Sequence, residues 1–372
     1  MALTISATDT EVQKPVNVIM QQTLLRNARI NACYFTGSQP GSLIMHGGSA
    51  TAKWRRYNTS ADNASGIAPS TTALTELTGN AAYGQSRTPD TVHLTDVTAA
   101  VSKYGQFYIL NEEMDVFNFN PDMDGIARTM GITAGRASNY LHRNTLEDNV
   151  TLRYASNVAS DGAVVSAVAV GDFDRIVNEL ARNYAEPFTP MAGGSENVGT
   201  SPLLQGYWAF THPDVAYDVS KLSGFISVKQ YGSYTEVAPG EFGAYERAGY
   251  SIRFIQTPEA SIDTGSGGAV TSLDLRSTSG NVDLYTTVVI GRDAHGSLGF
   301  GTQWGDGVYR AGEANPSNIE MIPGGRLVNA PAGPGDPFKE LGTLAYKFWY
   351  GGAILNANWA RGLRSGATLL TN

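Results

Sequence analysis

Histidines are the residues most often used to hold a metal ion or to act as a general base, but their spacing here favours neither role. The five histidines are scattered, at positions 46, 93, 142, 212 and 295. Metal sites need His, Cys or acidic ligands at short regular spacings such as His-Glu-x-x-His, and no such run is present. Asp122-x-Asp124-Gly125 begins like a calcium loop but is too short and lacks the closing glutamate. We therefore expect no metal site.

Nucleophilic and acid–base chemistry also lacks its usual signals. The Gly-x-Ser-x-Gly elbow is absent. A base could stand in Thr211-His212-Pro213-Asp214, but a strand end followed by proline and an acidic first helical turn explains that run without chemistry. Glu112, Glu113 and Asp115 could supply paired carboxylates, although such a trio is more typical of solvated surface. We expect no catalytic residue and no enzyme.

Phosphate-binding motifs are missing too. Neither a Walker motif nor a Gly-x-Gly-x-x-Gly turn between a strand and a helix occurs, so no cofactor is expected. The segment 291–296 reads as a tight turn that an Arg292–Asp293 pair braces. The one dense basic cluster, Lys53-Trp54-Arg55-Arg56, could touch phosphate, but a salt-bridge patch at the root of a projecting loop is an equally good interpretation.

Composition limits the class of protein. With 372 residues the chain exceeds the length of about 250–300 at which a single core stops growing. A net charge of −8 argues against a general nucleic-acid binder. Only 16% of residues are charged, against about 25% in an average domain. Cys33 is the single cysteine, no apolar run reaches the length of a membrane helix, and the first residues lack a signal-peptide pattern. We expect a soluble, intracellularly made protein with either an unusually uncharged surface or very large interfaces.

Apolar periodicity predicts long elements. The helices are expected over 15–33, from Pro121 to about Tyr154, and over Phe173–Tyr184. The strands are expected over Ala52–Tyr57, Thr95–Leu110 with a glycine bulge at Gly105, Gly206–Thr211, Ser251–Gln256, Asp283–Gly291 and Gly342–Leu363 with a kink at Gly351-Gly352.

A projecting hairpin is expected between the first two strands. Residues 58–93 are polar, rich in small side chains and without lysine, and a loop this long inside a compact domain needs a function. Such extensions leave apolar faces that one copy of the chain cannot cover. Neighbouring copies in a symmetric assembly would cover them.

Several separated stretches resemble the major capsid proteins of tailed bacteriophages with the HK97-type fold, and more closely the coat proteins of N4-like phages. The resemblance covers roughly residues 45–372, and any single stretch is weak, whereas their common order is specific. The matching stretches are 53–57, 95–105, Arg143-Asn144, 210–218, 228–231, 240–243, 252–255, 291–296, 341–343, 349–356 and Trp359.

The resemblance implies an α+β, HK97-like capsid fold divided into five parts. These are an N-terminal arm (1–44), an extended-loop hairpin (45–96), a peripheral domain with a long spine helix and a long sheet (97–165), an axial domain (166–330) and a C-terminal strand returning to the peripheral domain (331–372).

It also implies a structural role. Copies would assemble as hexamers and pentamers of an icosahedral head around double-stranded DNA, bound without sequence specificity and without a membrane. A separate scaffolding protein, a portal and a decoration protein would be partners. The shell would form in the host bacterial cytoplasm and become part of the virion. Because the loop lacks lysine, we expect no covalent link between subunits.

Seven residues are candidates for inter-subunit or structural contacts: Lys53, Arg55, Arg56, Tyr57, Arg143, Trp349 and Trp359. The arginines are expected to bridge acidic residues between elements or subunits. Five aromatic residues are expected in a core between the long sheet and the long helix: Tyr57, Phe107, Tyr346, Phe348 and Trp349.

Two alternatives stay open. An encapsulin-like compartment would share the fold but enclose a protein cargo, so co-purifying protein or DNA separates the two. A secreted, β-rich carbohydrate-binding protein or glycosidase would suit the Gly, Tyr and Asn content, and would run as a monomer.

Overall fold

The structure is a computed structural model. It describes residues 33–35, 37–43, 51–58, 93–111, 123–188, 205–231, 240–247, 249–270, 274–298, 319–325, 335–338 and 340–370. The expected helix at 15–33 and nearly all of the expected loop at 58–93 lie outside these residues. In the described part, no helix is long and apolar enough to cross a membrane.

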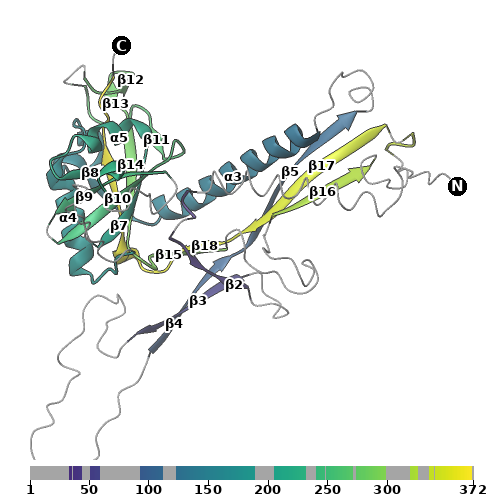
Figure 1. Cartoon of the computed structure of the whole chain (residues 1–372), viewed down its shortest axis with the longest axis horizontal. Helices are drawn as coiled ribbons and strands as arrows, with labels where there is room; N and C mark the ends of the chain where they lie inside the picture. Colours follow the sequence, from purple (N-terminus) through teal and green to yellow (C-terminus); the bar gives the residue numbers. More distant parts are fainter. Residues whose placement is uncertain are drawn as a thin grey trace, which may run out of the picture.

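A lobe at one end of the molecule is built on a mixed sheet (Figure 1). Its strand order is β6-β19-β14-β7-β10-β9-β8, with β11 paired to β14. The central strand β14 (Leu284–Ile290) has seven buried residues, as a strand covered on both faces requires. The lobe strands are β6 (Thr151–Tyr154), β7 (Gly206–Thr211), β8 (Phe225–Ser227), β9 (Glu241–Arg247), β10 (Tyr250–Gln256), β11 (Ile262–Asp263) and β19 (Ala360–Ser365).

Two helices pack in the lobe. Helix α4 (Val170–Arg182) buries Phe173, Ile176, Val177 and Leu180, which the helical spacing predicts to share one face. Helix α5 (Pro213–Ser220) begins with proline at its first turn, and the His212 side chain caps it. The prediction of a structural role for this His-Pro-Asp run is consistent with that cap.

An arm extends away from the lobe (Figure 1). It consists of the long helix α3 (Met123–Glu147) and a three-stranded antiparallel sheet of β16 (Ile319–Gly325), β17 (Leu341–Tyr350) and β5 (Ser102–Asn111). Alternate residues of β17 are buried, and Leu344, Tyr346, Phe348 and Tyr350 form one core cluster with Ala127, Met130 and Ala134 of α3. The expected sheet-on-helix packing is thus present.

Small sheets connect the arm and the lobe. One pairs β1 (Gln39–Pro40) with β15 (His295–Ser297) and β18 (Gly352–Ile354), and another pairs β2 (Ser42–Leu43) with β3 (Thr51–Asn58) and β4 (His93–Ala100). The remaining elements are the hairpin β12 (Ser277–Thr278) and β13 (Asn281–Val282), and 3₁₀ turns at Ala155–Asn157, Asp161–Ala163, Val228–Gln230 and Ala357–Trp359.

Three predicted elements differ in extent. The strand expected over Thr95–Leu110 breaks at Val101 and not at Gly105, because Val101 turns into a core cluster as the chain passes from β4 to β5. The long helix ends at Glu147, and the next residues pair with β19 as strand β6. The segment Gly342–Leu363 is three strands in three sheets, with the change of direction at Gly351.

Candidate assembly surface

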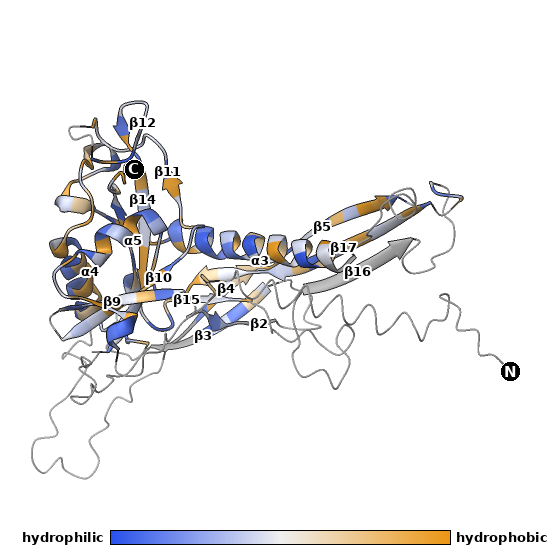
Figure 2. Cartoon of the chain, turned by 45° about the horizontal axis from the view of Figure 1, so that its top comes forward, coloured by the Kyte–Doolittle hydropathy of each residue, from blue (hydrophilic) through white to orange (hydrophobic). Residues whose placement is uncertain are grey.

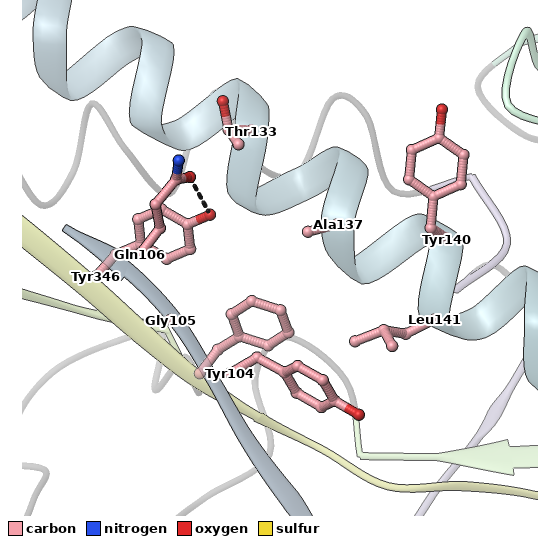
Figure 3. Close-up of a pocket in the computed structure, with 9 residues that line it drawn as sticks. Tyr104, Gly105, Gln106, Thr133, Ala137, Tyr140, Leu141 and Tyr346 are labelled. Carbon is pink, nitrogen blue, oxygen red and sulfur yellow. Dashed lines mark hydrogen bonds between the residues drawn. The ribbon is translucent and has the colours of Figure 1, made fainter. Parts of the chain in front are cut away.

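The face of the arm sheet toward α3 contains a groove (Figure 3). Gln106 pairs with Tyr346 and Tyr104 with Phe348 across β5 and β17, so these side chains point to the helix. The groove holds about 440 Å³, and Tyr346 donates a hydrogen bond of 3.2 Å to Gln106 at its wall. No charged side chain is among its lining residues, which are Tyr104, Gly105, Gln106, Thr133, Ala137, Tyr140, Leu141, Tyr346 and Phe348.

The opposite face of β5 exposes two large apolar side chains. Phe107 is 66% exposed and Ile109 is 56% exposed. The prediction that Phe107 lies in the core is therefore wrong, because it is one residue out of phase with Tyr104 and Gln106 and points away from α3. Figure 2 shows hydrophobic residues along β5 and β17 toward the far end of the arm.

The basic cluster lies at the root of the hairpin formed by β3 and β4. The Asp96 carboxylate accepts from Arg55 at 3.0 Å and pairs with Lys53 at 2.5 Å, and hydrogen bonds from Arg55 and Lys53 lower the pKa of Asp96. The expected salt-bridge patch at the loop root is therefore present for these two residues. Arg56 and Tyr57 occupy positions on β3 opposite Thr95 and Leu94, and their side chains lie outside the described part.

Trp54, between those basic residues, is the anchor that sequence reasoning missed. Its indole is 5% exposed and donates to the Gln39 carbonyl at 3.2 Å. Gly41 lies against the ring, where an added Cβ would meet it at 2.5 Å, and Gly296 of β15 is equally close-packed. The available signal was the apolar residue alternating with Lys53 and Arg55 in a strand.

Arg143 lies where α3 meets the lobe. Its guanidinium donates to the Glu259 carbonyl at 2.8 Å, lies 4.8 Å from the Tyr140 ring centroid and is 3.8 Å from the Glu147 carboxylate. Burial raises the pKa of Glu147. The expectation that Arg143 bridges elements is consistent with these contacts.

Glu259 is a second residue that sequence reasoning did not identify. Its carboxylate is 5% exposed and accepts from Arg136 at 2.9 Å and from the Asn139 amide. Asn139 in turn accepts from the Tyr34 backbone amide at 2.8 Å. Three distant segments therefore meet at one buried carboxylate, and no local pattern marks contacts separated by more than a hundred residues.

The two tryptophan candidates have different surroundings. Trp349 is half-buried, packs against the core cluster that contains Trp54 and Val101, and has the Lys103 ammonium 5.3 Å from its ring centroid. Its assignment to the core under α3 is wrong, because neighbouring residues of a strand point to opposite faces. Trp359 donates from Nε1 to the Asn183 carbonyl at 2.9 Å and contacts both large lobe clusters.

Two histidines lie in the joint between arm and lobe. His142 of α3 and His295 of β15 are 1% and 2% exposed, and their ring nitrogens have no hydrogen bond of good geometry. Burial lowers the pKa of His142 to about 3 and that of His295 to about 4. His142 packs edge-on to Tyr350, at 4.8 Å between ring centroids.

The cluster of polar side chains at the start of α5 makes structural contacts. At the start of α5, Asp214 accepts from Tyr285 at 2.9 Å and pairs with Arg276 at 3.1 Å, and burial lowers the pKa of His212. Within the described ranges, no three His, Cys, Asp or Glu side chains are grouped to hold a metal ion. The structure distributes Lys53, Arg55, Arg143, Trp349 and Trp359 over the hairpin root, the joint and the lobe, and does not gather them into one pocket.

Comparisons with known proteins identify phage capsid proteins as relatives. No family model matches the chain. A curated relative, the major capsid protein of Pseudomonas phage KPP21, is 23% identical over 281 residues, which are 72% of this chain and 67% of the relative.

Solved structures with a similar fold include phage capsids. The capsid of Ralstonia phage GP4 has a TM-score of 0.58 at 10% identity, covering 90% of this chain and 88% of that one. The capsid of cyanophage Pam1 has a TM-score of 0.52 at 10% identity, covering 86% and 85%. These similarities do not test the N4-like subfamily, which stays a prediction. The chain therefore has the HK97-like fold of phage capsids, and its sequence is similar to that of a phage major capsid protein.

Proposed function

We propose that the chain assembles into hexamers and pentamers that close an icosahedral head around double-stranded DNA. The observation that supports this best is the arm. Six of the eleven large hydrophobic side chains that are exposed in the described part belong to the arm or its end: Tyr104, Phe107, Ile109, Tyr140, Phe338 and Leu341. The other five lie in the lobe: Val165, Tyr184, Ile262, Leu369 and Leu370. Exposed apolar side chains that lie close together on one extension are typical of an interface.

Each part of the molecule would have its own role in the assembly. The lobe would be the axial domain; β6 and β19 from outside 166–330 complete its sheet, whereas β16 at 319–325 pairs in the arm. Helix α3 with its sheet would be the peripheral domain. The loop at 58–93 would lie over a neighbouring subunit, and the N-terminal arm at 1–44 would reach another. Arg56 and Tyr57 would serve at the loop root, where Lys53 and Arg55 pair with Asp96.

We further propose a non-enzymatic, structural protein that acts without a cofactor. Its partners would be other copies of itself, a separate scaffolding protein, a portal and a decoration protein. The net charge of −8 suits a shell that encloses DNA without binding it tightly. Assembly would take place in the host bacterial cytoplasm and the product would be a virion component.

Electron microscopy of particles made with and without the candidate scaffolding protein tests the proposal. We expect closed icosahedral shells when both proteins are produced. Particles from infected cells should protect DNA from nuclease, whereas an encapsulin-like compartment would contain a protein cargo. Material that stays monomeric with every candidate scaffolding protein and in infected cells would contradict the proposed function.

A further inference from the structure

The groove and the exposed apolar residues lie on opposite faces of the same strand. Tyr104 and Gln106 of β5 point to α3 and line the groove, whereas Phe107 and Ile109 point away from it. We call Phe107 and Ile109 the ridge. Opposite the ridge, β17 carries only Ala345 and Thr343. Because these neighbours are small, both ridge side chains stand clear of the sheet.

The groove is matched to an apolar insert. Its lining is aromatic, aliphatic or neutral, and the Tyr104 and Tyr140 rings beside it are each 38% exposed. At about 440 Å³ the space has room for the Phe and Ile side chains of a ridge. Burying an aromatic and an aliphatic side chain in an uncharged hollow desolvates apolar surface without stranding a charge.

A ridge cannot reach the groove of its own arm, because the sheet separates them. The geometry points to a second copy as the occupant: the Phe107–Ile109 ridge of one subunit fills the groove between α3 and β5 of the next. This inference rests on the proposed function, since it specifies a contact within the assembly.

The contact has a direction. If the ridge of one copy faces the groove of a second, then the second copy's ridge and the first copy's groove point away from each other. A twofold axis cannot satisfy both sites at once, so the contact is heterologous. Heterologous contacts repeat head to tail and close into rings when the rotation per copy permits, which is the symmetry that a hexamer or pentamer needs.

Single substitutions test the ridge. Phe107→Asp should reduce the assembled fraction about tenfold or more, as expected when a central aromatic anchor is lost. The thermal midpoint of the unassembled chain should stay unchanged because the side chain is exposed. Phe107→Leu is the matched control and should assemble. Wild-type yields of shells or rings from Phe107→Asp would overturn the inference while leaving the proposed function intact.

Mixing two variants tests the direction. Phe107→Asp keeps a groove but lacks a ridge, whereas Ala137→Phe keeps a ridge but fills the groove; Ala137→Ser is its control. Neither variant should associate alone, and an equal mixture should give one-to-one pairs and no larger species in sedimentation or native mass spectrometry. If Ala137→Phe fails to fold, Tyr140→Asp replaces it. Larger rings from the mixture, or no pairs at all, would overturn the inference, and pairing does not require that shells form.

Discussion

The Glu259 carboxylate accepts a hydrogen bond of 2.9 Å from the Arg136 guanidinium, and this contact joins the lobe to the long helix of the arm. Glu259 is buried, whereas the Arg136 side chain is 53% exposed. Removing the two partners should therefore have different costs. Loss of the buried Glu259 carboxylate leaves its donors without an acceptor, whereas the exposed Arg136 side chain occupies a position that water can reach.

Glu259→Ala should lower the free energy of unfolding by about 2–3 kcal/mol, because it leaves the buried Asn139 amide unsatisfied. Arg136→Ala should cost less, about 1 kcal/mol, since the guanidinium is half-exposed and Asn139 still donates to the carboxylate. Urea denaturation of the unassembled chain measures both. Equal losses would contradict the view that Glu259 organises the joint.

Gly296→Ala should destabilise the root of the hairpin. A Cβ at this position would overlap the Trp54 indole, and overpacking of this kind costs about 1–3 kcal/mol. Trp54→Ala should cost more, about 3–5 kcal/mol, by leaving a cavity. In the double variant the added methyl group enters the space that the indole vacated. The double variant should therefore lose less stability than the sum of the losses of the two single variants. Strict additivity in denaturation experiments would show that the two residues do not interact.

Two phenylalanines of the arm should behave oppositely. Phe348 is 2% exposed beneath α3, and Phe348→Ala should cost about 3–5 kcal/mol. Phe107 is 66% exposed, and Phe107→Ala should change the stability of the unassembled chain by no more than about 0.5 kcal/mol. Calorimetry of both variants provides the measurement, and a large loss for Phe107 would reverse the assignment of the sheet faces.

Acid should weaken the joint between arm and lobe. The unfolded chain protonates His142 and His295 as the pH falls through 6.5, whereas the folded chain keeps them neutral down to about 3 and about 4. The stability that depends on the neutral rings is therefore complete above pH 6.5 and is lost progressively toward pH 4. The slope reaches about 2–3 kcal/mol per pH unit for the pair.

Replacing both histidines with leucine removes their pH-dependent contribution to stability. Between pH 6.5 and 4.5, the double variant His142→Leu, His295→Leu should show a flatter dependence of the urea midpoint on pH than the unchanged chain. The same slope in both proteins would mean that other groups carry the acid sensitivity.

Denaturing electrophoresis of mature particles should show only the monomer band for this chain. The segment 58–93 contains no lysine that could form an isopeptide bond, so subunits are expected to be held without covalent links. A ladder of bands above the monomer would refute this prediction.

Alternation and helical spacing were sufficient to predict the main elements. The predicted strand Gly206–Thr211 coincides with β7, and the expected apolar face of α4 is the buried one. These patterns repeat within a few residues, so a short stretch of sequence is enough to identify the element. The hairpin root was also predictable, because Lys53 and Arg55 on β3 need an acidic neighbour on the next strand and Asp96 supplies it.

Sequence reasoning failed where the decision depends on distant packing. On β5, Tyr104 and Gln106 face the helix while the more apolar Phe107 and Ile109 face outward, and period-two spacing alone does not say which face is covered. Phe348 and Trp349 cannot share a face, so one of two adjacent core assignments had to be wrong. Glu259 and Trp54 depend on partners brought close only by the complete fold.

The position of β19 has a consequence for synthesis. Residues 360–365 form this strand, yet it lies inside the lobe sheet between β6 and β14. While the ribosome is still translating earlier residues, the lobe lacks an interior strand and cannot close its hydrophobic centre. Each polypeptide can therefore complete its lobe only after residues 360–365 have left the ribosome, and shorter nascent chains would present an unfinished sheet to any partner.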